Sequence, residues 1–224
     1  MKTKNLHSWN LTYVQARDLQ AGLAKQVRFT PIRKFPKIIA GLDCAFSKDE
    51  KNIYAVVVVM KLPDFEIIET VFAKSKVKFP YIPGLLSFRE APVCLKAIKK
   101  LKNVPDCFIV DGQGLAHPRR FGIACHIGLL IDKPTIGCAK SRLIGEFKKL
   151  LTQKGSASPL MDGDEIIGAV VRTRKNVKPV FVSVGNKCTL DDAVKIVLDC
   201  SPKYRLPEPS RLAHQLVSKA KLQL

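Results

Sequence analysis

Two aspartates stand within or directly after strongly apolar segments of this 224-residue chain. Asp43 lies inside the run 38–46, and Asp111 directly follows the run 107–110. A carboxylate in an apolar strand is costly unless it is paired or bound to a cation. Two carboxylates on adjacent strands could share Mg²⁺, a hard cation that binds oxygen ligands and retains water for phosphate chemistry. The alternative for each aspartate is a bond to nearby backbone or to a lysine.

Glu90 and Lys140 have less specific settings. Glu90 ends Ser87-Phe88-Arg89-Glu90, which fits the S-x-x-E capping box, and Pro92 favours a helix that begins slightly later. Residue chemistry alone therefore favours a helix cap over a metal ligand for Glu90. Lys140 follows the apolar run 135–138. A lone lysine is usually solvated, but this one ends a strand near the edge expected to collect the carboxylates.

Two loops carry features suited to nucleic acid. The loop 79–86 holds Tyr81 and Ile82 between two prolines, which stiffen the backbone so that both side chains should project from a rigid tip. Such a tip can wedge between bases, although a turn that packs on its own domain is the simpler explanation. The loop 111–120 combines glycines, a histidine and two arginines suited to phosphate contacts. His126, in an apolar run, is interpreted as a helix or core histidine.

The charge balance indicates a polyanionic partner. The chain has 38 Lys+Arg and 19 Asp+Glu, a formal net charge of +19. Such a surplus is typical of nucleic-acid binders, although RNA scaffolds and membrane surfaces attract the same charge. The longest apolar run, 55–60, is far shorter than the roughly 20 residues of a membrane span. Seven cysteines without CxxC spacing suggest buried thiols in a reducing compartment, so we expect a cytoplasmic protein without membrane contact.

The elements that must position these residues follow from the apolar patterns. Short polar turns link the first three strands, which predicts an antiparallel meander; helix–strand alternation follows. We expect strands at 38–46, 53–60, 65–72, 107–110, 135–138, 165–172 and 180–184, and helices at 8–24, around 95–101, 121–131, 190–198 and 210–221. The pattern predicts an α/β fold, a mixed sheet flanked by helices, in a single domain spanning 1–224.

Five segments in order along the chain carry a family resemblance. They are Gly41-Leu42-Asp43; Pro80-Tyr81-Ile82-Pro83-Gly84 with Phe88-Arg89-Glu90; Val110-Asp111-Gly112 with Gly114 and His117-Pro118-Arg119; Gly137 with Ala139-Lys140-Ser141; and Arg205-Leu206-Pro207-Glu208-Pro209 with Arg211-Leu212-Ala213-His214. Together they resemble the endonuclease V family of deoxyinosine-specific endonucleases. The resemblance implies an RNase H-like mixed sheet, with the antiparallel meander followed by parallel strands.

The resemblance also implies roles for individual residues. Asp43, Glu90 and Asp111 would form a metal-binding acidic cluster for Mg²⁺, with Mn²⁺ as an alternative, and Lys140 and His214 would complete the catalytic neighbourhood. The resemblance further implies a wedge of Pro80, Tyr81, Ile82 and Pro83, nucleic-acid contacts from Arg89, His117 and Arg119, and a lesion-base pocket formed by backbone groups at Gly84, Leu86, Gly112 and Ile123.

The activity implied is DNA repair. A family member nicks a deoxyinosine-containing strand at the second phosphodiester bond 3′ to the lesion, by Mg²⁺-dependent hydrolysis that leaves 3′-hydroxyl and 5′-phosphate ends. We expect a monomer that binds inosine-containing DNA. Two alternatives remain open from the sequence: an inosine-specific ribonuclease acting on RNA, and a non-catalytic nucleic-acid-binding protein on a decayed nuclease fold.

Overall fold

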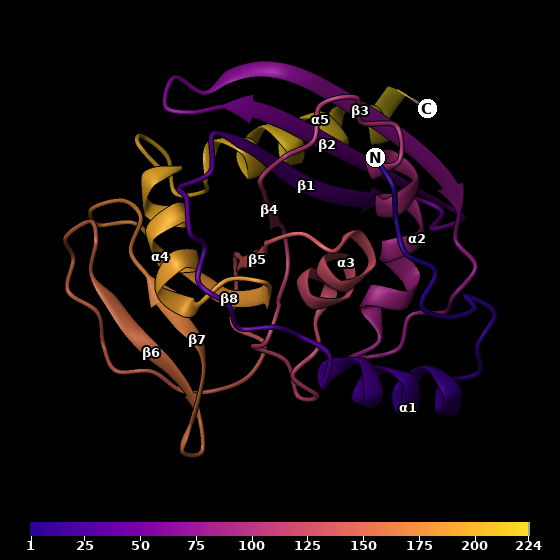
Figure 1. Ribbon diagram of the computed structural model, residues 1–224, viewed down its shortest axis with the longest axis horizontal. Helices are drawn as coiled ribbons and strands as arrows, with labels where there is room; N and C mark the ends of the chain where they lie inside the picture. Colours follow the sequence, from indigo (N-terminus) through magenta and orange to yellow (C-terminus); the bar gives the residue numbers. More distant parts are fainter. Residues whose placement is uncertain (224) are drawn as a thin grey trace.

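A computed structural model describes residues 1–223, and the strands within this range form one mixed sheet (Figure 1). The strands are β1 (Ile38–Phe46), β2 (Asn52–Lys61), β3 (Glu66–Lys76), β4 (Cys107–Val110), β5 (Thr135–Ala139), β6 (Ala157–Asp162), β7 (Glu165–Val171) and β8 (Val180–Asn186). The helices are α1 (Tyr13–Ala24), α2 (Leu86–Ile98), α3 (Ile123–Ile131), α4 (Leu190–Asp199) and α5 (Glu208–Gln223). The order across the sheet is β3-β2-β1-β4-β5-β8-β7-β6.

The strand directions confirm the predicted mixed sheet. Strands β1, β2 and β3 form an antiparallel meander, and β4 and β5 then add in parallel to β1. Strands β8, β7 and β6 extend the sheet in antiparallel fashion from β5. The carboxyl ends of β1, β4 and β5 consequently meet at one edge. That edge is where Asp43, Asp111 and Lys140 were expected to gather.

Alternation along β1 decides which side chains face which helices. Ala40 and Leu42 belong to the apolar cluster that includes α2 and α3, whereas Ile39 belongs to the cluster that includes α4 and α5. Because alternate residues of a strand share a face, Gly41 and Asp43 point with Ile39 toward α5. The α5 backbone lies directly against Gly41: a Cβ there would be 2.1 Å from the carbonyl carbon of Pro209.

Two expectations about elements were wrong. Helix α2 begins at Leu86, earlier than Pro92 suggested, and Pro92 lies inside it. The Ser87–Glu90 capping box is therefore not used: Leu85 is the N-cap, and the Ser87 hydroxyl lies 3.2 Å from Nδ1 of His126. Strand β6 was also missed, since its Pro159 and its lack of β-branched residues weaken the strand pattern. As an edge strand it tolerates that proline.

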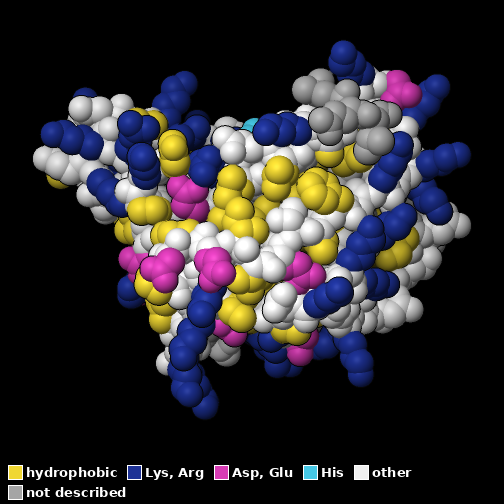
Figure 2. All heavy atoms as spheres, turned by 90° about the horizontal axis from the view of Figure 1, so that it is seen from above, with side chains coloured by type: hydrophobic (Ala, Val, Ile, Leu, Met, Phe, Trp, Pro, Cys, Tyr) yellow, Lys and Arg dark blue, Asp and Glu magenta, His cyan; other side chains and the backbone are white. Residues whose placement is uncertain are grey.

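The predictions about His126, the cysteines and the overall charge agree with the structure. His126 is fully buried in α3, and burial lowers its pKa to about 3. All seven cysteines are free and six are buried. Lys and Arg side chains ring the face in Figure 2, where acidic side chains are fewer, as the +19 charge leads one to expect. No helix within residues 1–223 is both long and apolar enough to cross a membrane.

Candidate active site

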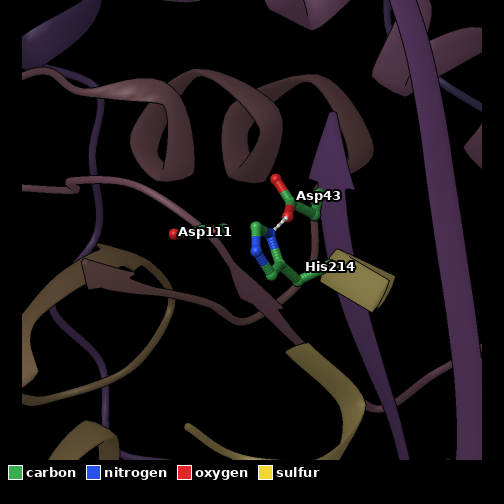
Figure 3. Close-up of side chains that lie close together, drawn as sticks. All are labelled: Asp43, Asp111 and His214. Carbon is green, nitrogen blue, oxygen red and sulfur yellow. Dashed lines mark hydrogen bonds and ion pairs between the residues drawn. The ribbon is translucent and has the colours of Figure 1, made fainter. Parts of the chain in front are cut away.

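The structure brings Asp43, Asp111 and His214 together from three elements. Asp43 is on β1, Asp111 directly follows β4, and His214 is on α5. One potential ligand atom from each lies within 4.8 Å of the others, and Nδ1 of His214 is 2.7 Å from Oδ2 of Asp43 (Figure 3). Asp43 shares its face with Gly41, so its side chain points toward α5, where the His214 ring meets it. Sheet alternation and the position of α5 therefore produce this cluster.

Lys140 completes the polar group from the next strand. It follows β5, its Nζ donates a hydrogen bond to Oδ2 of Asp111, and Nζ lies 3.1 Å from Nδ1 of His214. Lys140 is thus paired with a carboxylate, whereas a lone lysine usually takes a solvated surface position. One ammonium, one imidazole and two carboxylates thus share the carboxyl edge of the parallel strands.

The electrostatics of the cluster suit a cation. Asp43 is only 8% exposed, and burial, followed by the negative charge of Asp111, raises its pKa to about 6. Two carboxylates this close repel each other in their charged forms, and a bound cation would relieve that repulsion. The donor set of two carboxylates and an imidazole fits a divalent metal ion. These residues could therefore hold a metal.

Glu90 lies nearby but outside this trio. It is on α2, which packs against the opposite face of the sheet from α5, and it is 9% exposed. Burial raises its pKa to about 8, and the charges of Asp43 and Asp111 act in the same direction. The thiol of Cys44, the neighbour of Asp43, acts in the opposite direction and lowers this pKa. Glu90 thus approaches the cluster from the α2 side, in the second turn of the helix rather than at a cap.

A cavity of about 400 Å³ opens beside the cluster. Its lining includes Asp111, Glu90 and Lys140, so the cavity is continuous with the polar group. All four residues that were expected to form a base pocket also line it: Gly84, Leu86, Gly112 and Ile123. The loops before α2 and α3 both contribute to its walls.

The two central residues of the proline-flanked tip, Tyr81 and Ile82, differ in their exposure to solvent. Tyr81 is 66% exposed and projects as expected. Ile82, also expected to project, is half-buried against an apolar cluster that includes Phe79 and Phe88. The tip therefore offers one aromatic ring to the outside and uses the neighbouring aliphatic side chain as an anchor.

Three side chains expected to contact nucleic acid are engaged with the protein itself. Arg89 pairs with Glu50 at 2.8 Å and lies over the ring of Phe46. The Arg119 guanidinium donates a hydrogen bond to the carbonyl of Gly84 at 2.7 Å. His117 is 5% exposed, and burial, reinforced by the charge of Arg119, lowers its pKa to about 4. Arg119 and His117 thus belong to the surroundings of the cavity, whereas Arg89 contacts β1 and the turn that follows it.

Two residues near the site were missed as functional candidates. Gln20 of α1 lines the cavity and contacts both of its loops. Arg205 donates hydrogen bonds to the carbonyls of Lys140 at 2.6 Å and Pro179 at 2.8 Å, which fixes the backbone that carries Lys140. Arg205 lies in a segment that the family resemblance singled out, whereas no sequence signal distinguished Gln20 from the other glutamines of the chain.

Comparisons with known proteins agree with one another. The sequence profile described as Endonuclease V matches residues 21–215. A protein named Endonuclease V from Dehalococcoides mccartyi is 46% identical over 214 residues, covering 96% of each chain. The crystal structure of endonuclease V from Streptomyces avermitilis superposes with a TM-score of 0.92 at 38% identity, covering 96% of each chain.

A further solved structure contains nucleic acid. It is endonuclease V from Ciona intestinalis in complex with a 24mer DNA containing an inosine followed by a ribo-adenosine. It superposes with a TM-score of 0.81 at 28% identity, covering 94% of this chain and 98% of that one. With a family profile that matches most of its length and a relative 46% identical over nearly all of it, this chain belongs to the endonuclease V family of nucleases.

Proposed function

We propose that this nuclease cuts deoxyinosine-containing DNA at the second phosphodiester bond 3′ to the lesion. We also propose that the whole chain forms a single domain. The observation that carries the proposal is the continuity of the cavity with the cluster of Asp43, Asp111, His214 and Lys140. A base turned into the cavity would place the adjoining backbone at the cluster. The inosine-containing DNA bound by the Ciona intestinalis relative supports this choice of substrate.

The proposed reaction is hydrolysis at phosphorus. Water adds to phosphorus, the P–O3′ bond breaks, and the departing 3′ oxygen takes up a proton, which leaves 3′-hydroxyl and 5′-phosphate ends. Asp43 and Asp111, with Glu90 and His214 nearby, would hold Mg²⁺ or, alternatively, Mn²⁺. Such an ion, when bound, stabilises negative charge that develops on the phosphate oxygens.

The protein groups themselves contribute position and charge. The ammonium of Lys140, held by Asp111 and by a backbone that Arg205 anchors, would offset negative charge on the scissile phosphate. His214 would position water near Asp43, to which its ring is already oriented. The backbone groups of the cavity walls would read the turned-out base.

A nicking assay tests the proposed function. The substrates are three end-labelled duplexes of the same sequence that differ at one position. That position holds deoxyinosine in the first, an inosine ribonucleotide in the second and guanine in the third. With Mg²⁺ we expect a single product from the deoxyinosine strand, produced by a cut one nucleotide beyond the lesion's own 3′ phosphate. In EDTA we expect no product. Extension of the nick by a polymerase would verify the 3′-hydroxyl. Cleavage of the ribonucleotide strand alone would reassign the substrate to RNA, and no cleavage of any strand would contradict the proposal.

The exposed ring of Tyr81 gives a prediction about the wedge. We expect Tyr81→Ala to weaken binding to deoxyinosine duplex about tenfold or more and binding to the matched single strand much less. The reason is that turning a base out of a duplex costs a few kcal/mol, which a ring filling the vacated space offsets. Fluorescence anisotropy in EDTA measures both affinities. Tyr204→Ala, another partly exposed tyrosine, is the control, and equal losses on duplex and single strand would count against a wedge.

A further inference from the structure

Gln20 is a buried polar side chain that joins α1 to both walls of the base cavity. It is 1% exposed. Its Nε2 donates hydrogen bonds to the carbonyl of Gly84 at 3.0 Å and to that of Phe121 at 2.7 Å, while its Oε1 accepts one from Nε of Arg119. Both amide hydrogens and the oxygen are therefore used. The opposite orientation of the amide would set its oxygen against two carbonyls, so these contacts also fix which end is the donor.

The two carbonyls belong to segments far apart in the chain. Gly84 lies 64 residues from Gln20, in the loop before α2, and Phe121 lies 101 residues from it, in the loop before α3. Residues of both loops line the cavity, and so does Gln20 itself. Leu86 and Ile123, two of the residues proposed to read the base, each follow one of these carbonyl-bearing residues by two positions. A displacement of either carbonyl would thus be transmitted to the wall groups.

Arg119 further restrains the backbone at Gly84. Its guanidinium donates to the same carbonyl as Gln20, and a Cβ on Gly84 would lie 2.5 Å from that guanidinium. Gly84 also has a φ of +77°, a conformation that favours glycine. One glutamine and one arginine therefore hold a glycine backbone in a fixed place, and the same glutamine also holds the carbonyl of Phe121.

We infer that Gln20 is a specificity-determining positioning residue, which sets the width of the base cavity by tying the Gly84 and Phe121 carbonyls to one rigid amide. The inference rests on the proposed function, because it concerns selection of the turned-out base. Gln20 makes no hydrogen bond to Asp43, Asp111, Lys140 or His214, so its loss should impair selection and leave the chemical step largely intact.

The test compares Gln20→Met and Gln20→Glu with the wild type. Methionine keeps the length and loses every hydrogen bond, whereas glutamate keeps the acceptor for Arg119 and loses both donors. For each we expect the ratio of kcat/KM on deoxyinosine strands to kcat/KM on guanine strands to fall at least about tenfold. The change should appear mainly in KM, with kcat for the deoxyinosine strand within about threefold. Anisotropy in EDTA should show the same loss of preference in binding, without any cleavage step.

A matched variant separates positioning from a general loosening of α1. Leu23 is 3% exposed on the same helix and packs in an apolar cluster with Phe121, but it does not line the cavity. Leu23→Ala should lower Tm at least as much as Gln20→Met while keeping the selectivity ratio. Equal loss of selectivity in Leu23→Ala, or unchanged selectivity in both Gln20 variants, would overturn the inference alone. A wild-type protein that cuts neither strand would overturn the proposed function and the inference with it.

Discussion

Replacing Asp43 with alanine should reduce cleavage by on the order of 10³-fold or more while DNA binding and folding are retained. Asp43 contributes a carboxylate to the only group of three potential ligands found among the described residues, and its Oδ2 is 2.7 Å from His214. Alanine would remove a potential metal ligand and also the hydrogen-bond partner of the His214 imidazole. Single-turnover kinetics at saturating Mg²⁺ measure the chemical step, and anisotropy in EDTA measures binding.

The stability of this variant supplies a second readout. Asp43 is buried beside Asp111, and both burial and that neighbour raise its pKa, so the charged pair opposes folding. We therefore expect Asp43→Ala to unfold at the same temperature as the wild type or a higher one. Asp164→Ala, at an exposed turn between β6 and β7, is the control and should leave both rate and Tm unchanged. Normal turnover of Asp43→Ala would remove this residue from the mechanism.

The strand ends could be predicted because burial and alternation are local signals. The apolar runs 38–46 and 107–110 correspond to β1 and β4 with the same bounds. The apolar pattern placed each aspartate at a strand, but that these two strands are adjacent and parallel, with Leu42 opposite Val110, is seen only in the structure. The meander followed from the short polar turns between its strands.

Contacts between distant segments could not be predicted from those local signals. Ile82 and Arg89 were expected to face nucleic acid, but whether a side chain at a loop or helix start points outward depends on the cluster beneath it. Gln20 reaches residues 64 and 101 positions away, and an amphipathic helix pattern says nothing about such partners. His214 entered only through the family resemblance, since α5 alone gives no reason to place one histidine over β1.

Gly41→Ala should separate α5 from β1 and lower kcat by about 100-fold, because a displacement near 1 Å is enough for such a loss. A Cβ at this position would lie 2.1 Å and 2.2 Å from the carbonyl carbon and oxygen of Pro209, and 2.4 Å from the nitrogen of Ser210. All three are backbone atoms, so no side chain can rotate away and the start of α5 must move. Overpacking of this kind also costs about 1–3 kcal/mol of stability, measurable by urea unfolding.

The matched control is Gly22→Ala. Nothing lies within 4 Å of a Cβ on Gly22, which is in α1, so alanine there should raise stability by about 0.5–1 kcal/mol and leave kcat unchanged. The two substitutions add the same methyl group, one in open space and one between a strand and a helix. Full activity in Gly41→Ala would show that the position of α5 tolerates displacement, contrary to the close packing seen here.

The expected loss in Gly41→Ala follows from how the cluster is assembled. His214 lies four residues beyond Ser210, about one helical turn, so it moves with the start of α5. Gly41 is hydrogen-bonded into the sheet between β2 and β4, which prevents β1 from yielding instead. The 2.7 Å contact between His214 and Asp43 should therefore lengthen, although neither residue is altered. If Gly41→Ala retains DNA binding but loses turnover, the glycine two residues before Asp43 serves to bring the histidine of α5 to that carboxylate.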